Sequence, residues 1–324
     1  MHLELNQRWP APASPKPVVI IGTGGIIRDA HLPAYRKAGF AVAGVTDLDP
    51  QRSAAVARDF DIASTYRNVA EAVTQNGTRA IYDIAVPPDA ITDILPELPE
   101  GAATLIQKPM GADQDQARQI RTICRDRNLK SGINFQLRFS PMMLAVRDAI
   151  DRGLLGELLD IEVHLNLYTP WHIFPFLIPM ARVELSVHSI HYLDTIRAMA
   201  GNPKGVFARS IGDPRAEQFA QTRTTVILDY GDRLRGVMSI NHNHQGGRKF
   251  QSAWIRFEGS EGAMMAKLLK AFSAQRSASL AVSQAYVDRL LGAFGPAGTA
   301  DRVPGLEPKP SRSTTLPLDA LTDR

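Results

Sequence analysis

A short apolar run that ends in closely spaced glycines constrains the fold of this chain more than any other feature. Residues 18–25 read "VVIIGTGG", and a segment with helical spacing, "DAHLPAYRKAG", comes next and ends at Gly39. A β-branched run, a glycine turn and a helix in this order are typical of the first unit of a doubly wound sheet. The pattern therefore predicts an α/β fold from about Val18 onward.

The same alternation of strand-like and helical segments continues to about residue 135. The further strand-like runs are "FAVAGVTD", "AIYDIAVPP" and "ATLIQKP", and the helical runs are "DPQRSAAVARDF" and "ADQDQARQIRTICRDRN". Strands that alternate with helices form a parallel sheet that is covered by helices on both faces. We therefore predict a dinucleotide-binding type of domain over residues 18–135.

The pattern changes after residue 135. An amphipathic helical run, "SPMMLAVRDAIDRG", precedes the alternating run "ELLDIEVHLNLY" and two hairpin-like stretches, "TRTTVILDYGDRLRGVMSINHNH" and "SAWIRFEGSEGAMMA". These runs predict a second α/β domain over residues 136–270 with an open, mostly antiparallel mixed sheet. The proline-containing residues 1–17 are expected to form a flexible tail, and residues 271–324 a weakly structured segment.

The composition narrows the class of protein and its location. The net charge of +4 has no long basic run behind it, which disfavours a nucleic-acid partner. No apolar stretch reaches about 18 residues, so no membrane span is expected. Residues 1–17 lack the basic start and apolar core of a signal peptide. The single cysteine, Cys124, fits a reducing compartment, and we expect a cytoplasmic protein.

The glycine turn predicts a dinucleotide site. Four turn residues would let the backbone approach a pyrophosphate at the helix N-terminus: Gly22, Gly24, Gly25 and Ile26. Asp47 ends the second strand-like run, where a carboxylate binds the ribose hydroxyls of NAD. NAD is therefore the expected cofactor, and the nearby Arg52 leaves NADP as the alternative. A doubly wound sheet without a cofactor is the other interpretation of this pattern.

Several motifs together resemble the Gfo/Idh/MocA oxidoreductases, the glucose–fructose oxidoreductase and inositol dehydrogenase family. They are "GTGGIIRDAHLPAY", "GVTDLDPQR", "VPP", "QKP", "NFQLRFSP", "RGLLGE", "HYLDTIRAMAG" and "EGSEGA", spread from about Val18 to about Ala266. The resemblance implies an N-terminal Rossmann domain and a C-terminal domain with an open sheet. It also implies NAD(P)-linked oxidation or reduction of a sugar, polyol or derivative. A homo-oligomer, dimer or tetramer, that assembles through the open sheet face is a further implication.

The resemblance also assigns residues around the nicotinamide. It places Val86 and Pro87 of "VPP" at the cofactor, and it matches the family's Glu-Lys-Pro motif to "QKP" at residues 107–109. Lys108 then points at substrate and nicotinamide and orients a hydroxyl or assists proton transfer. Gln107 departs from the family pattern, because an amide cannot stabilise the lysine ammonium by charge. The alternative for Lys108 is an exposed loop lysine.

Two histidines in "HSIHYLD" supply the remaining catalytic candidates. Alignment of this stretch on "DTIRAMAG" places the family histidine at His191, and it places Val187 where the family has a catalytic aspartate. At roughly 100° per residue, Glu184, Val187, His188 and His191 would share one helical face. We predict that His191 is the general base, and that His188 and Glu184 orient it or bind substrate hydroxyls.

Other interpretations of these histidines remain open. The spacing E-x-x-x-H-x-x-H places three metal ligands on one helical face, but a nicotinamide enzyme needs no metal for hydride transfer, so none is expected. Two ordinary core histidines are the other alternative.

Four further residues are candidate substrate ligands: Asn134, Arg138, Trp171 and His172. Asn134 and Arg138 lie where the chain of the family enters the second domain, and a structural ion pair is the alternative for Arg138. Trp171 and His172 belong to an aromatic, proline-containing loop that would form either a sugar-stacking wall or a subunit contact. The favoured function is thus an NAD(P)-dependent dehydrogenase or reductase acting on CH–OH groups. The alternative is a dinucleotide-binding regulator or subunit without catalysis.

Overall fold

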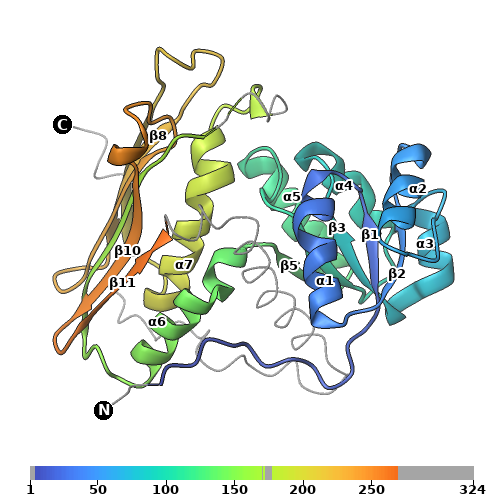
Figure 1. Cartoon of the computed structure of the whole chain (residues 1–324), viewed down its shortest axis with the longest axis horizontal. Helices are drawn as coiled ribbons and strands as arrows, with labels where there is room; N and C mark the ends of the chain where they lie inside the picture. Colours follow the sequence, from blue (N-terminus) through green and yellow to red (C-terminus); the bar gives the residue numbers. More distant parts are fainter. Residues whose placement is uncertain (1–3, 170, 172–176, 269–324) are drawn as a thin grey trace.

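The computed structural model describes residues 4–169, 171 and 177–268, which form two lobes (Figure 1). One lobe is built on a five-stranded sheet and the other on a six-stranded sheet. The prediction of an α/β fold with a parallel sheet followed by an open mixed sheet is therefore confirmed. The predicted C-terminal segment 271–324 lies outside the described residues.

The first lobe is a parallel sheet in the order β2-β1-β3-β4-β5. Its strands are β1 (Val18–Ile21), β2 (Val42–Thr46), β3 (Ile81–Ile84), β4 (Ala103–Ile106) and β5 (Lys130–Ile133). Its helices are α1 (Leu32–Ala38), α2 (Pro50–Asp59), α3 (Val69–Asn76), α4 (Ile91–Ile94) and α5 (Gln114–Asp126).

Helices cover both faces of this sheet because its strands are apolar on both sides. Val18 and Ile20 point into a core with α1 and α2, whereas Val19 and Ile21 point into a core with α3, α4 and α5. Local signals set the helix limits. The Asp49 carboxylate caps the N-terminus of α2, and Gly39 ends α1 at a φ of 72°.

The second lobe is a mixed sheet in the order β11-β10-β6-β9-β8-β7. Its elements are α6 (Pro141–Asp151), β6 (Leu158–Asn166), α7 (Ile190–Ala200), β7 (Gly205–Ile211), β8 (Arg223–Asp229), β9 (Arg235–Asn241), β10 (Ser252–Gly259) and β11 (Ala263–Lys267). The β6–β9 pair is parallel and the other pairs are antiparallel. Both predicted hairpins are present, and β7 was not predicted.

One face of this sheet is covered by α6 and α7, which lie toward the first lobe (Figure 1). Residues of β8 alternate between buried and exposed, as Val226 and Leu228 pack inward while Ile227 stays on the outer face. The outer face carries a charged group, in which Arg235 and Arg256 pair with Asp160 and Glu162. Among the residues that the structure describes, no helix covers this outer face.

An extended N-terminal segment joins the lobes along one side (Figure 1). Residues 4–17 contain no helix or strand, yet the Asn6 N–H donates to Asp148 and the Glu4 carbonyl accepts from Arg152, both on or beside α6. The Trp9 ring meets Phe139 edge-on, with 5.8 Å between ring centroids. These contacts place parts of the segment against α6 and Phe139.

Candidate active site

The predicted cofactor and catalytic residues of the first lobe gather at one edge of its sheet. The glycine turn follows β1, Asp47 follows β2, Val86 and Pro87 follow β3, and Lys108 follows β4. The carboxyl ends of parallel strands meet at the same edge, which is where ligands bind in open α/β sheets. Topology therefore brings together residues that are far apart in the sequence.

The geometry of the glycine turn fits a bound dinucleotide. Gly22 has a φ of 89°, and a Cβ there would lie 2.6 Å from the Ala85 carbonyl oxygen and 3.0 Å from Val86 Cγ1. A Cβ on Gly24, in contrast, would meet no atom within 4 Å. Gly22 is thus needed for the fold of the turn. Gly24 leaves open space where a phosphate can approach the helix N-terminus.

The turn begins a helix whose first turn is a π-helical turn, η1 (Ile27–His31). Ile27 stands where the dinucleotide fingerprint usually has glycine or alanine, and its side chain is fully buried in the core. Gly25 and Ile26 are exposed beside it. The Ile27 side chain therefore packs in the core below the glycine turn, and it does not project to the surface where Gly25 and Ile26 are exposed.

Asp47 is tied to the glycine turn. Its Oδ2 accepts hydrogen bonds from the Thr23 N–H at 2.7 Å and the Thr23 hydroxyl at 2.8 Å. Burial would raise the pKa of Asp47, but the N–H groups of Asp49 and Thr23 and the charge of Arg52 lower it below its usual value. The Arg52 guanidinium is 3.9 Å from Asp47. A carboxylate held at the end of β2 fits a ribose-binding role.

Lys108 lies between the two lobes. The Lys108–Pro109 peptide bond is cis, and the Lys108 N–H donates to Gln107 Oε1 at 2.8 Å. Desolvation lowers the pKa of the Lys108 ammonium to about 8, although part of the side chain still reaches the surface. Gln107 thus contacts the backbone of Lys108. The side chain as a whole is half-buried, and the pKa of its amine is close to neutral pH, which suits proton transfer.

His191 lies on α7 of the second lobe, close enough to Lys108 for the lysine charge to act on its imidazole. Its ring meets Phe135 edge-on at 6.0 Å, and its Nδ1 has no hydrogen-bond partner among the described residues. Burial and the positive charge of Lys108 lower the pKa of His191 to about 3. The imidazole is therefore neutral at physiological pH and available as a hydrogen-bond acceptor or donor.

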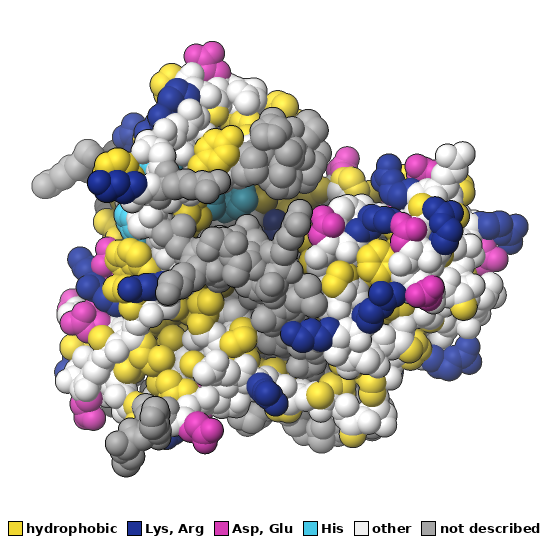
Figure 2. Space-filling view, in the orientation of Figure 1, with side chains coloured by type: hydrophobic (Ala, Val, Ile, Leu, Met, Phe, Trp, Pro, Cys, Tyr) yellow, Lys and Arg dark blue, Asp and Glu magenta, His cyan; other side chains and the backbone are white. Residues whose placement is uncertain are grey.

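His188 and His242 form a stacked pair behind His191, with 4.2 Å between ring centroids. Trp171 closes the pair on one side, because its ring meets His188 edge-on at 5.6 Å. Burial holds the pKa of His188 well below its usual value, with further contributions from His242, Lys108 and His191. Burial lowers the pKa of His242 to about 4. We call His188, His191 and His242 the histidine cluster (histidines are cyan in Figure 2).

Glu184 lies under the stacked pair and is fully buried. Its Oε1 accepts from the Ser189 hydroxyl at 2.7 Å and lies 3.9 Å from His242 Nε2. Burial raises the pKa of Glu184 to about 7, and the hydroxyls of Thr224 and Ser189 offset part of that effect. A carboxyl group that is close to half-protonated at neutral pH therefore lies beside the histidine cluster.

The predicted shared face of Glu184, Val187, His188 and His191 is only partly present. The helix opens with a π-helical turn, η8 (Leu185–Ser189), which has more residues per turn than the α-helix assumed from sequence. Val187 packs in an apolar cluster with Trp171, Val183 and Phe219. The position where the family has an aspartate is thus part of a small core.

The other predicted substrate ligands have structural partners or lie outside the description. The Nε and Nη2 groups of Arg138 both donate to the Asp194 carboxylate. The structure thus shows the ion pair that was the alternative interpretation for Arg138. Asn134 is buried and its Nδ2 contacts His31 Nε2. Trp171 is buried against the histidine cluster, whereas His172 lies outside the described residues.

Sequence reasoning gave His242 no catalytic weight, and it missed His31 and Asp83 altogether. Asp83 is a fully buried carboxylate within β3, bonded to His31 Nδ1. An acidic residue inside an otherwise apolar strand run, "AIYDIAVPP", was the signal for it. His242 joins the cluster only because β9 runs beside α7, which no local pattern indicates.

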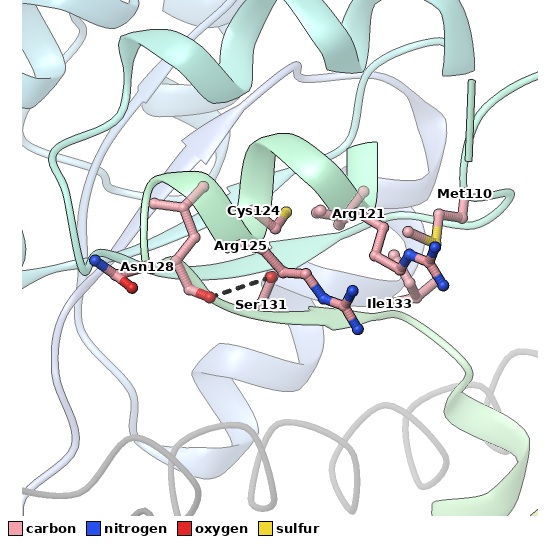
Figure 3. A pocket seen from close by; sticks show the side chains of 9 residues that line it. Met110, Arg121, Cys124, Arg125, Asn128, Ser131 and Ile133 are labelled. Carbon is pink, nitrogen blue, oxygen red and sulfur yellow. Dashed lines mark hydrogen bonds between the residues drawn. The ribbon is translucent and has the colours of Figure 1, made fainter. Parts of the chain in front are cut away.

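Two further features of the described residues concern metal binding and a hollow outside the candidate active site. Within the described part of the chain, no group of three or more His, Cys, Asp or Glu side chains could hold a metal ion. A hollow between α5 and β5 is lined by Ile106, Met110, Arg121, Cys124, Arg125, Asn128, Leu129, Ser131 and Ile133 (Figure 3). Neither Lys108 nor any residue of the histidine cluster lines it, so it is separate from the candidate active site.

Comparison with known families agrees with the geometry. A family model described as an oxidoreductase family with an NAD-binding Rossmann fold matches residues 16–135, and the GFO/IDH/MocA C-terminal domain matches residues 143–265. The chain belongs to the Gfo/Idh/MocA oxidoreductase family. The first model describes the NAD-binding Rossmann fold of the family, and a sugar-derivative reductase is among the relatives.

Individual relatives are distant. A 1,5-anhydro-D-fructose reductase from Ensifer adhaerens is 27% identical over 48% of this chain and 46% of its own length. A trans-1,2-dihydrobenzene-1,2-diol dehydrogenase from Bos taurus is 26% identical over 70% of this chain and 66% of its own. The chain thus spans about half to two thirds of these relatives.

A solved oxidoreductase from Agrobacterium radiobacter, in complex with NAD+, L-tartaric acid and magnesium, superposes with a TM-score of 0.70. It is 18% identical, over 87% of this chain and 90% of the other. At this identity the likeness supports the fold alone. No helix within the described ranges is long and apolar enough to cross a membrane.

Proposed function

We propose that this chain is an NAD-dependent dehydrogenase or reductase that acts on a CH–OH group of a sugar, polyol or sugar derivative. The observation that carries the proposal is that Lys108 follows β4 at the strand ends that bear the glycine turn, and that its charge acts on His191 of the other lobe. NAD, when bound there, supplies the hydride acceptor. The names of the relatives supply the substrate class, as several act on sugars.

The pKa values divide the proton chemistry between Lys108 and His191. In the oxidation direction, the substrate hydroxyl must lose its proton as hydride leaves the carbon. The neutral amine of Lys108, whose conjugate acid has a pKa of about 8, is basic enough to accept that proton near neutral pH. His191, with a pKa of about 3, is a much weaker base. His191 therefore orients the hydroxyl by a hydrogen bond. This assignment transfers to Lys108 the base role that the sequence gave to His191.

The remaining residues bind or orient. Asp47 and the Gly22–Gly25 turn hold the ribose and pyrophosphate of NAD, with Val86 and Pro87 beside the nicotinamide. His188 lies on the side of the substrate, and the buried Trp171 and Glu184 support the histidine pair from behind. The protein is a cytoplasmic homo-oligomer in this proposal, because a lone cysteine fits a reducing compartment and the outer face of the open sheet carries exposed apolar residues.

The test combines cofactor binding with turnover. NAD and NADP binding are measured by fluorescence, and a panel of sugars and polyols is then assayed at the nicotinamide absorbance. We expect NAD to bind, one substrate class to react, and oxidation to rise with pH up to a plateau above about 8 as Lys108 becomes neutral. The Lys108→Met variant should lose about 10²- to 10⁴-fold in kcat with NAD affinity kept.

Lys130→Met is the matched control, because Lys130 begins β5 at the opposite end of the sheet from Lys108. Turnover should stay unchanged in it. Binding of NAD without turnover on a broad panel would instead indicate a non-catalytic dinucleotide-binding protein. Absence of both NAD and NADP binding would contradict the proposal.

A further inference from the structure

A buried polar network lies below Lys108 in the first lobe. His31 Nδ1 is 2.7 Å from Asp83 Oδ2, which also accepts from the Tyr35 hydroxyl at 2.7 Å. On the other side of the ring, His31 Nε2 is 3.0 Å from Asn134 Nδ2 and 3.4 Å from Gln107 Nε2. Asp83, His31, Asn134 and Gln107 are each less than 9% exposed. Water therefore does not compete for these hydrogen bonds.

The Asp83 carboxylate and the Lys108 backbone N–H determine where the protons of this network lie. At one end the Asp83 carboxylate requires a donor, so Nδ1 of His31 carries a proton. At the other end the Lys108 N–H requires an acceptor, so Gln107 presents Oε1 to it at 2.8 Å and turns its amino group toward His31. His31 Nε2 must then be an acceptor. The hydrogen bonds thus give the two ring nitrogens of His31 fixed and different roles, with Nδ1 as the donor and Nε2 as the acceptor.

We infer that Asp83 and His31 are positioning residues for Lys108, acting through the amide of Gln107. Asp83 selects the tautomer of His31, and His31 selects the orientation of Gln107. Gln107 in turn fixes the backbone at Lys108. The inference deepens the proposed function and rests on it for the role of Lys108, but the network itself can be observed without any turnover.

The network also explains why glutamine occupies position 107 in this chain. A glutamate could accept the Lys108 N–H equally well, but it has no N–H group to offer His31 Nε2. One carboxylate oxygen of a glutamate would replace Gln107 Nε2, which lies 3.4 Å from His31 Nε2. Two acceptors would then face each other without a proton between them, which is unfavourable. Glutamine satisfies both neighbours and adds no negative charge next to Lys108, whose amine is thereby left without a carboxylate on this side.

The decisive variant is Asp83→Asn, which removes the charge that selects the tautomer. The new amide can turn its amino group toward His31 Nδ1, which moves the ring proton to Nε2, where it meets the N–H groups of Asn134 and Gln107. Relief of that conflict turns Gln107 over and leaves the Lys108 N–H without its acceptor. A misplaced catalytic group costs about 10- to 100-fold in rate, so we expect a loss of kcat of that size with NAD affinity unchanged. Gln107→Met, which lacks the acceptor altogether, should show the same loss.

Nitrogen-15 NMR provides the readout that a purely structural role would not affect. In the wild-type chain, His31 should carry its proton on Nδ1, and the Lys108 amide should exchange slowly with solvent. Both signatures should be lost in Asp83→Asn. Thr104→Val is the matched control, because Thr104 is fully buried in the neighbouring strand β4 and its hydroxyl has no partner among the described residues.

Three results would overturn the inference. One is a wild-type His31 protonated on Nε2. Another is a fast-exchanging Lys108 amide in the wild type or an unchanged one in Asp83→Asn. The third is wild-type kcat in both variants, or a loss of kcat that merely follows a loss of NAD binding and folding. An inactive but correctly networked wild-type chain would contradict the proposed function while leaving the tautomer and exchange results to decide the network.

Discussion

At the scale of single residues, burial has different consequences for groups that share the candidate active site. Desolvation brings the pKa of Lys108 and the pKa of Glu184 toward neutrality from opposite directions, to about 8 and about 7. It brings the pKa of His191 to about 3, away from neutrality. The histidines that attract attention in the sequence are therefore neutral, and the groups that titrate near pH 7 are the lysine and the glutamate.

Glu184 should make the stability of the protein depend on pH. Its folded-state pKa of about 7 lies above its unfolded value of 4.5, so its protonated form is favoured by folding. The contribution is fully present below about pH 4.5 and is lost as the pH rises through 7. We expect Glu184→Gln, which mimics the protonated acid, to be more stable than wild type by roughly 3 kcal/mol at pH 8 and equal to it near pH 4.5. Urea unfolding of both proteins at several pH values measures this difference.

The histidine cluster also makes stability depend on pH, because its lowered pKa values favour folding at higher pH. This effect is the same in wild type and in Glu184→Gln, so it cancels when their unfolding free energies are compared. If the difference in unfolding free energy between wild type and Glu184→Gln were the same at pH 4.5 and pH 8, Glu184 would not be the neutral acid described.

At the scale of elements, the π-helical turn before α7 determines which side chains join the histidine cluster. His191 lies within reach of the charge of Lys108, and His188 stacks on His242. Val187 packs with Trp171, Val183 and Phe219 and is 5% exposed. A regular α-helix over the same residues would group Val187 with the histidines. The turn therefore separates the small core from the polar cluster.

This arrangement predicts that restoring an aspartate at position 187 does not help the enzyme. Val187→Asp would place a carboxyl group among apolar side chains, which costs about 3 kcal/mol or more in stability. Val187→Ala, which only removes two methyl groups, should cost about 1–2 kcal/mol. Denaturant unfolding measures both. A stable Val187→Asp protein with increased kcat would show instead that position 187 faces the reacting centre.

At the scale of the whole molecule, the two lobes have different relations to their surroundings. The first sheet is covered by helices on both faces, whereas the second sheet has one open face. On that face Phe207 of β7 is paired in register with Ile227 of β8, and their side chains are 71% and 47% exposed. Exposed apolar pairs of this kind are typical of interfaces.

We predict that charges at this pair dissociate the proposed homo-oligomer. The wild-type chain should run as a dimer or larger species in size-exclusion chromatography with light scattering, and the double variant Phe207→Asp, Ile227→Asp should have a smaller mass. Leu48→Asp is the control, since Leu48 is fully exposed on the other lobe and should leave the mass unchanged. A monomeric wild type, or a double variant with the wild-type mass, would contradict assembly through this face.

The sequence by itself determined the features that depend on local pattern. The glycine turn, the alternation of strands and helices and both hairpins are predicted from neighbouring residues, because turn geometry and side-chain period are local. The resemblance to a family added Lys108 and His191. Strand β7 was missed because "GVFARSI" lies at an edge of the sheet and its burial does not alternate.

Only the tertiary structure decided which of these residues meet and what charge they carry. The pKa values of Lys108, Glu184 and His191 depend on desolvation by chain segments far away in the sequence. His242 reaches His188 through the pairing of the second sheet, and His31 reaches Gln107 and Asn134 through the order of strands in the first. Arg138 is bound to Asp194 across 56 positions. Contacts of this range follow from the packing of whole elements, and no short stretch of sequence specifies them.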